Sequence, residues 1–201
     1  MLVIIDYGAG NIQSVVNAFQ HIGCKSILTA SPEIIAQADA VVLPGVGSFG
    51  DAMENMRSRG LEQPIKDFIS SGKPFLGICL GLQLLFESSE ESPGVSGLGI
   101  LKGKILRIPK AENLKIPHMG WNSLALCGNG AIYRDMQAEP YVYFVHSYYL
   151  HAEEDIVTAT ARYGAEIHAS VQKGNVSACQ FHPEKSGELG LQLLRNFVLQ
   201  R

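Results

Sequence analysis

A cysteine between two glycines is the feature of the sequence with the clearest chemical meaning. The segment GICLG at 77–81 joins an apolar run at 75–78 to a helix expected over 80–86. This is the pattern of a nucleophile elbow, a sharp strand-to-helix turn that exposes a nucleophile, here with Cys in place of Ser. A helix that begins directly after the cysteine also favours its reactive thiolate form. The pattern predicts a nucleophilic Cys79; a buried core thiol is the alternative.

A histidine and a carboxylate near the C-terminus could serve this nucleophile. His182 and Glu184 follow a strand-like run at 176–180, and side chains two apart on an extended chain point the same way. A cysteine nucleophile needs an imidazole that takes and returns a proton, and the imidazole needs a partner that fixes its tautomer. Cys79, His182 and Glu184 could fill these three roles. Taken alone, the two C-terminal residues would more often be an ordinary histidine and a solvated carboxylate.

A glycine-rich loop offers amide donors for an oxyanion. The segment PGVGSFG at 44–50 follows the third apolar strand, so it should lie at the same edge of the sheet as Cys79. The amide of Leu80 and one loop amide would together form a two-donor oxyanion hole. The candidate loop donors are Gly45, Val46 and Gly47. A tight surface turn is the alternative, and the phosphate-loop pattern GxxxxGK[ST] is absent from the segment.

The spacing of apolar residues predicts an α/β fold that would position these groups. Short apolar runs alternate with amphipathic stretches, which indicates a mostly parallel central sheet with helices on both faces. The expected strands are 2–6, 24–28, 40–43 and 75–78, and the expected helices are 11–22, a brief one after Ser31-Pro32, 51–57 and 63–69. An added, partly antiparallel region is expected at 97–108, 123–126, 141–150, 156–163, 167–172 and 176–181, before a last helix at 187–199.

Composition limits the classes of protein that fit. A chain of 201 residues with 46% hydrophobic side chains can bury one substantial core, so a single domain over 1–201 is expected. The net charge of −3 and the scattered basic residues argue against a nucleic-acid partner. No signal peptide or membrane helix is recognisable, which predicts a soluble cytoplasmic protein with reduced cysteines and no membrane association. Without a CxxC pair or a complete dinucleotide fingerprint, neither metal nor cofactor is expected.

The three motifs together carry a family resemblance. The PGVG loop, the GxCxG elbow and HPE near the C-terminus, in this order, resemble class I (triad) glutamine amidotransferases. The resemblance spans essentially the whole chain, and no triad position departs from it. It implies a flavodoxin-like sheet on which Cys79, His182 and Glu184 hydrolyse L-glutamine to glutamate and ammonia without a cofactor.

Further segments resemble the glutaminase subunits of imidazole glycerol phosphate synthases in histidine biosynthesis. They are DYGAGN at 6–11, PHMGWN at 117–122, YFVHSY at 143–148 and HPEKS at 182–186. The resemblance implies a heterodimer with a cyclase (β/α)8-barrel that uses the ammonia to make imidazole glycerol phosphate and aminoimidazole carboxamide ribonucleotide. It also implies that glutamine is held by Gln83, Glu91, Ser147 and Tyr148. The implied subunit interface contains Asn11, Trp121, Tyr143 and Lys185. Without the resemblance, each of these would be interpreted as a core, strand or solvated residue.

Three other functions compete with this interpretation. A glutaminase could serve another synthase, such as those for anthranilate or pyridoxal phosphate, but the segments at 117–122 and 143–148 favour the histidine pathway. A non-catalytic scaffold is disfavoured by the intact set of Cys79, His182 and Glu184. A cysteine peptidase or thiol stress protein on a similar sheet is disfavoured by the HPE and PGVG segments. We also expect that the partner completes the oxyanion hole, through a peptide flip near Val46.

Overall fold

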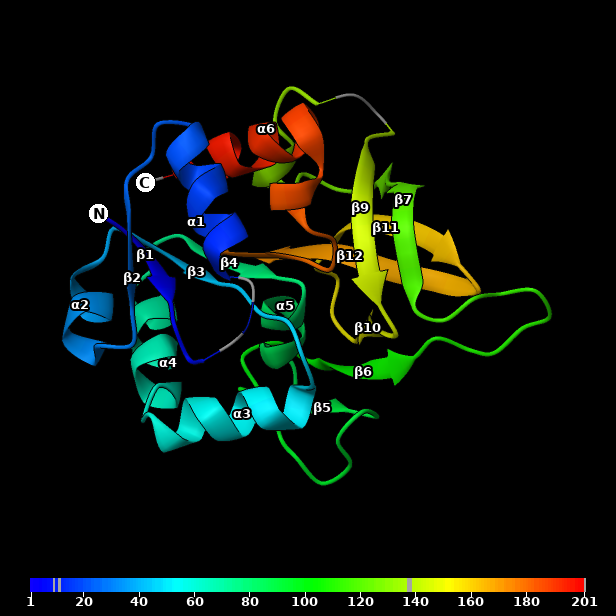
Figure 1. Cartoon of the computed structure of the whole chain (residues 1–201), viewed down its shortest axis with the longest axis horizontal. Coiled ribbons are helices and arrows are strands. Elements are labelled where there is room, and N and C mark those ends of the chain that lie inside the picture. The colour runs from blue at the N-terminus through cyan, green and yellow to red at the C-terminus, as the bar shows by residue number, and fades with distance from the viewer. Residues whose placement is uncertain (9, 11, 137–138, 201) are drawn as a thin grey trace.

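A computed structural model describes residues 1–8, 10, 12–136 and 139–200. Within these residues, a central sheet of eight strands lies between two groups of helices, and smaller sheets of three and two strands extend from one side (Figure 1). The predicted α/β class, a mostly parallel sheet with added antiparallel strands, is confirmed. No helix of the described residues is long and apolar enough to cross a membrane.

The first part of the central sheet is parallel, and its inner strands are buried. Its strands, in spatial order, are β2 (Ser26–Thr29), β1 (Leu2–Ile5), β3 (Ala40–Leu43), β4 (Phe75–Ile78) and β13 (Val176–Cys179). Every residue of β1, β3, β4 and β13 is buried, as expected for strands that have helices on both faces. Because the strands are parallel, their carboxyl ends meet along one edge of the sheet.

The helices cover the two faces through two separate apolar cores. On one face are α1 (Ile12–His21) and α6 (Gly187–Val198), and on the other are α2 (Pro32–Gln37), α3 (Phe49–Ser58), α4 (Glu62–Ser70) and α5 (Leu80–Leu84) (Figure 1). Alternate side chains of β1 enter different cores: Leu2 and Ile4 pack with α1 and α6, whereas Val3 and Ile5 pack with the other helices.

The second part of the sheet is antiparallel. Beyond β13 follow β12 (Ala165–Lys173), β11 (Val157–Tyr163) and β8 (Ala125–Leu126). A separate ribbon pairs β7 (His118–Ser123) with β9 (Tyr141–His146), and a third sheet contains β10 (Tyr148–Ala152), β6 (Gly103–Arg107) and β5 (Ser88–Ser89). Short 3-10 helices lie at η1 (Ala131–Tyr133) and η2 (Pro183–Lys185).

Several predicted boundaries in this region are wrong. The strand predicted over 141–150 is two strands, because the chain leaves the ribbon at Ser147 and enters the third sheet as β10. Of the strand predicted over 97–108, only β6 forms, and the helix predicted over 80–86 ends at Leu84. Both errors have one cause: the amide of Leu98 donates to the carbonyl of Leu84, the last residue of α5, and the amide of Ile100 donates to that of Leu85, which follows it. This segment therefore caps the helix. Strand β7 was not predicted.

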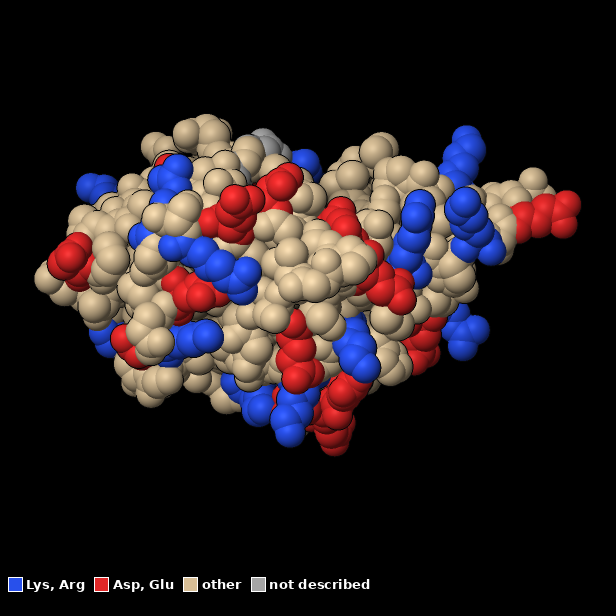
Figure 2. All heavy atoms as spheres, turned by 90° about the horizontal axis from the view of Figure 1, so that it is seen from below, with Lys and Arg blue, Asp and Glu red and all other residues tan. Residues whose placement is uncertain are grey.

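Basic and acidic side chains are mixed on the surface. On the face shown in Figure 2, Lys and Arg alternate with Asp and Glu across the described residues, without a continuous basic stripe. Such a stripe is the usual feature of a surface that binds a nucleic-acid backbone. This face therefore offers no evident site for one.

Candidate active site

Cys79 lies in the predicted elbow, between β4 and α5. Its backbone has φ 54° and ψ −108°, a region that a residue with a side chain rarely adopts and that costs of order 1–3 kcal/mol. A Cβ added to Gly81 would overlap the carbonyl of Leu43, and one added to Gly77 would lie 2.8 Å from the carbonyl oxygen of Gly81. Only glycines therefore fit on either side of the elbow. Helix α5 is only five residues long, shorter than the helix predicted over 80–86.

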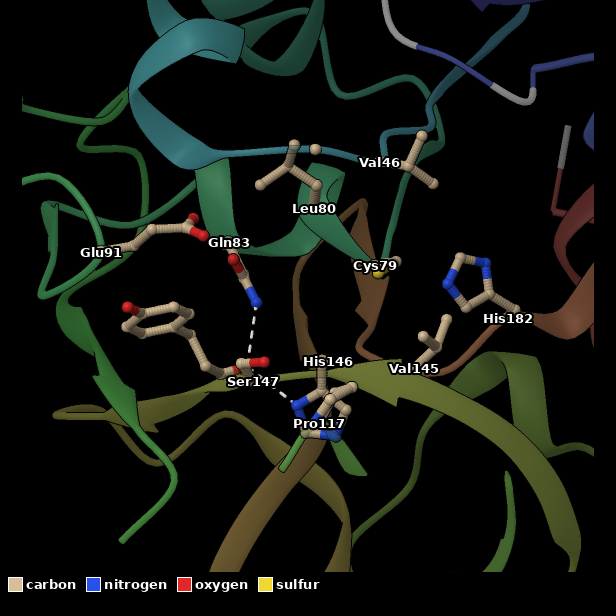
Figure 3. A pocket seen from close by; sticks show the side chains of 12 residues that line it. Val46, Cys79, Leu80, Gln83, Glu91, Pro117, Val145, His146, Ser147 and His182 are labelled. Atoms are coloured by element: carbon tan, nitrogen blue, oxygen red, sulfur yellow. Dashed lines mark hydrogen bonds between the residues drawn. The ribbon is translucent and has the colours of Figure 1, made fainter. Parts of the chain in front are cut away.

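His182 and Glu184 lie beside Cys79, at the carboxyl end of the neighbouring strand β13. Nδ1 of His182 is 2.7 Å from Oε1 of Glu184, and each side chain is only 2% exposed. The backbone amide of His182 donates to the carbonyl of Tyr143, which fixes the strand end against β9. Nε2 of His182 is buried and makes no hydrogen bond within the described residues, and its ring faces Cys79 in Figure 3.

The environment of His182 favours its protonated form. Burial alone would lower its pKa, because a charged ring loses its hydration. The negative charge of a Cys79 thiolate, together with the hydrogen bond and charge of Glu184, outweighs burial and raises the pKa of His182 from 6.5 to about 10. A thiolate beside an imidazolium is the arrangement that activates a cysteine nucleophile.

A pocket of about 370 Å³ opens over Cys79, a volume at the lower end of the range for small-molecule sites (Figure 3). It is lined by Val46, Gly47, Cys79, Leu80, Gln83, Glu91, Pro117, Val145, His146, Ser147, Tyr148 and His182. All the residues predicted to hold glutamine are in this set. In the described residues, no group of three or more His, Cys, Asp or Glu is placed to hold a metal ion.

The predicted oxyanion donors lie together, but the hole is closed. The amide of Leu80 donates to the carbonyl oxygen of Gly45, with a nitrogen-to-oxygen distance of 3.4 Å. The loop therefore presents a carbonyl where a second donor is needed. Gly45 packs so tightly that a Cβ there would overlap the Tyr7 hydroxyl, and Gly47 has φ 107°, which favours glycine.

The predicted glutamine-holding residues also make contacts within the protein. Nε2 of Gln83 donates to the carbonyl of Tyr148 at 3.1 Å and to Oε1 of Gln180 at 3.0 Å. The amide of Gln180 in turn lies 3.7 Å from Sγ of Cys79. Glu91 accepts a 2.8 Å hydrogen bond from the amide of Phe49, at the start of α3. Sequence reasoning missed Gln180, which the structure shows to be fully buried. In the sequence it is only a polar residue at the end of the strand-like run at 176–180.

Three of the four predicted interface residues form one cluster on the ribbon. The rings of Trp121 and Tyr143 are cross-strand neighbours with centroids 6.2 Å apart, and Nζ of Lys185 lies 5.9 Å from the centre of the Tyr143 ring. Trp121 is 56% exposed. The fourth residue, Asn11, lies outside the described residues. Met119 and Tyr141, which sequence reasoning did not single out, lie on the same face of the ribbon and are also exposed.

Known proteins resemble this chain over nearly its whole length. Residues 3–201 match the family Glutamine amidotransferase class-I. The chain is 50% identical to the imidazole glycerol phosphate synthase subunit HisH of Methanothermobacter thermautotrophicus, with 98% of each chain covered. It is 48% identical to the protein of the same name from Nostoc punctiforme, covering 100% of this chain and 96% of the relative.

Solved structures share the fold at lower identity. A crystal structure of a glutamine amidotransferase superposes with a TM-score of 0.77 and 20% identity, over 98% of this chain and 97% of the other. The structure of PurLQS from Thermotoga maritima superposes with a TM-score of 0.75 and 19% identity, over 98% and 97%. With the family match over nearly its full length, the chain belongs to the class-I glutamine amidotransferase family.

Proposed function

We propose that this chain is the glutaminase subunit of an imidazole glycerol phosphate synthase in histidine biosynthesis. It hydrolyses L-glutamine to glutamate and ammonia and passes the ammonia to a cyclase subunit. The observation that carries the proposal is that Cys79 and His182 line one pocket, while Glu184 contacts Nδ1 of His182 from outside the pocket lining. The named relatives, about 50% identical over almost the whole chain, support this synthase over others.

The first half of the reaction forms a thioester. The Cys79 thiolate attacks the carboxamide carbon of glutamine, and a carbon–sulfur bond forms as the carbonyl oxygen becomes an oxyanion. His182, held as imidazolium by Glu184, gives its Nε2 proton to the departing nitrogen. The carbon–nitrogen bond then breaks and ammonia leaves. The buried and otherwise unpaired Nε2 is the atom required for this transfer.

The second half releases glutamate. Neutral His182 takes a proton from a water molecule, which attacks the thioester carbon. The carbon–sulfur bond breaks and Cys79 leaves as thiolate beside the imidazolium, which restores the starting state of the enzyme. The new carboxylic acid loses its proton to solvent and departs as glutamate. Glu184 stabilises the imidazolium at both ends of the cycle through its 2.7 Å contact with Nδ1.

The closed oxyanion hole supports a gated enzyme. In the resting arrangement, the amide of Leu80 donates its hydrogen bond to the carbonyl of Gly45. Rotation of the peptide between Gly45 and Val46 would remove this carbonyl and turn the Val46 amide toward the oxyanion. Gly47 has no atom within 4 Å of the place where a Cβ would lie, and as a glycine it permits the backbone change that such a rotation needs. We propose that docking of the cyclase drives it, so that glutamine is not hydrolysed when no acceptor of ammonia is present.

The ribbon β7–β9 provides a surface for this partner. Trp121 and Tyr143 pack together with Lys185 over the Tyr143 ring, and Trp and Tyr are residue types enriched at binding hot spots. Val145, on the same face of the ribbon, lines the pocket, so a partner seated here would lie beside the catalytic cysteine. The proposed assembly is a heterodimer with a (β/α)8-barrel cyclase in the cytoplasm, in which this chain acts as one domain. The assembly, rather than this chain alone, would carry the lyase activity.

The proposal is tested by measuring glutamate release from purified chain, alone and with a matching cyclase barrel. We expect strong release only with the barrel, and none from the Cys79→Ala variant under either condition. Product formation by the barrel from free ammonia, without this chain, is the control for an active partner. Equal release with and without the barrel would contradict the gate. No release alongside an active barrel would contradict the proposed synthase.

A further inference from the structure

Two histidines outside the triad are paired across the ribbon. His118 on β7 lies directly opposite His146 on β9, and Nδ1 of His118 is 3.0 Å from Nε2 of His146. Both are more than nine-tenths buried. The ring of His118 is stacked between Phe144, with centroids 4.6 Å apart, and Tyr163, with centroids 3.9 Å apart. These contacts leave His118 little freedom to rotate.

The partners of the two rings define their tautomers. Nδ1 of His146 is 2.8 Å from the carbonyl oxygen of Tyr148, which only accepts, so this nitrogen carries a hydrogen. In a neutral ring, Nε2 of His146 is then an acceptor, and Nδ1 of His118 must donate to it. Nε2 of His118 is left to accept from the amide of Asn122, 3.4 Å away. The hydrogen bonds thus run in one direction, from Asn122 to the carbonyl of Tyr148.

This series of hydrogen bonds ends at the pocket. The Tyr148 carbonyl also accepts from Gln83, which bonds Gln180, whose amide lies against Sγ of Cys79. The backbone passes from β9 to β10 at Ser147, whose carbonyl accepts a hydrogen bond from the amide of Ile108. The carbonyl of Tyr148, the first residue of β10, is instead held by the side chains of Gln83 and His146. Figure 3 shows His146 and Gln83 reaching this segment from opposite sides.

We propose that His118 and His146 are positioning residues for glutamine binding: through the Tyr148 carbonyl they fix the Ser147–Tyr148 wall of the pocket. This inference rests on the proposed function, because it assigns the wall to the substrate glutamine. Neither histidine exchanges a proton with the substrate.

Burial keeps both rings in the neutral form that this series of hydrogen bonds requires. It lowers the pKa of His118 to about 4. For His146, burial and the nearby His118 and His182 outweigh the hydrogen bond to Tyr148 and lower the pKa to about 3. Both rings are therefore neutral at neutral pH, and neither adds a positive charge near the His182 imidazolium.

The tautomers can be measured without any activity. Long-range proton–nitrogen NMR spectra of uniformly labelled protein at pH 7 should show His118 and His146 as neutral rings with the hydrogen on Nδ1. The more common Nε2–H form for His146 would overturn the proposal, because that ring could not donate to Tyr148.

Kinetics of the complex with the cyclase test the role itself. His118→Phe keeps a ring in the stack but removes the donor, and loss of one buried hydrogen bond should raise the KM for glutamine about tenfold with kcat changed less than about threefold. His118→Asn and His146→Asn each keep an amide donor near the former Nδ1, so their KM should stay within about threefold of wild type. Tyr133→Phe, which removes a buried hydroxyl donor to Ser170 away from the pocket, should leave KM unchanged.

The outcomes separate this inference from the proposed function. If wild type releases glutamate with the cyclase but His118→Phe has unchanged KM, the positioning role is wrong and the glutaminase stands. A fall in kcat at constant KM, or an equal effect of Tyr133→Phe, would indicate a merely structural role. If His118→Phe does not fold, the positioning role is tested by the tautomers in the wild-type spectra and by the KM of His146→Asn for glutamine. If wild type releases no glutamate, the proposed function fails. The tautomers would still show whether the series of hydrogen bonds from Asn122 to Tyr148 exists.

Discussion

The two walls of the pocket are built in different ways. Cys79 and His182 follow β4 and β13, adjacent parallel strands whose carboxyl ends lie side by side. Ser147 and Tyr148 instead lie where β9 gives way to β10, between two small sheets. The first wall takes its geometry from backbone pairing within one buried sheet. The second is a junction between two sheets, where side chains of Gln83 and His146 add hydrogen bonds at the Tyr148 carbonyl. The reaction should therefore depend on the parallel sheet, and substrate and partner recognition on the added strands.

A change at Glu184 should have the largest effect and tests whether the parallel wall carries the reaction. Glu184→Gln removes the charge that stabilises the His182 imidazolium, so kcat in the complex should fall about 10³-fold, with a smaller change in KM. Steady-state glutamate release measures both constants. Glu188→Gln, at an exposed carboxylate with only a 3.7 Å contact to Arg195, is the matched control and should leave both unchanged. A loss under tenfold at Glu184 would contradict the triad.

Glycine substitutions in the two regions should differ in their effect on stability. Gly81→Ala forces a Cβ into the carbonyl of Leu43 and should lower the free energy of unfolding by about 3 kcal/mol or more. Gly120→Ala on the ribbon meets no atom within 4 Å. Its cost is the strain of φ 130°, about 1 kcal/mol. Urea denaturation gives both values, and equal losses would show that the elbow is no more constrained than the ribbon.

The exposed face of the ribbon should affect association without affecting the fold. Trp121→Ala should weaken binding of the cyclase by about 2 kcal/mol, roughly 30-fold in Kd, because an exposed aromatic anchor would be lost. The free energy of unfolding should change by less than about 0.5 kcal/mol. Leu28→Ala removes a comparably exposed apolar side chain from the edge strand β2 and should leave Kd unchanged. Equal weakening by both variants, measured by calorimetry, would argue against the ribbon as the docking surface.

The smallest expected effect is a dependence of stability on pH that arises at the parallel wall. Because folding raises the pKa of His182 from 6.5 to about 10, its contribution to stability is complete below pH 6.5 and is lost as the pH rises through 10. Glu184 is one of the groups that raise this pKa. The difference in unfolding free energy between wild type and Glu184→Gln should therefore be larger at pH 7 than above pH 10. A constant difference would mean that the two groups are not coupled.

The sequence was most informative where backbone pairing does the positioning. A buried parallel strand is a short apolar run, and neighbouring strands bring their carboxyl ends together, so the elbow and its histidine could be predicted from 75–81 and 176–184. In the added region the alternation of side chains is interrupted. The break at Ser147 and the cap formed by 97–101 depend on hydrogen bonds to distant residues, which local patterns do not contain. Gln180, His118 and His146 were missed for the same reason.

The hydrogen bond between the Leu80 amide and the Gly45 carbonyl has a consequence for regulation. Under the proposed peptide rotation, one rigid peptide unit is both the obstruction and the missing donor. A half-turned peptide offers neither arrangement, so each molecule is either competent or silent. A weak activator would then change the proportion of competent molecules, and each of these would turn over at the full rate. Graded activation of the population would arise from an all-or-none event in each molecule.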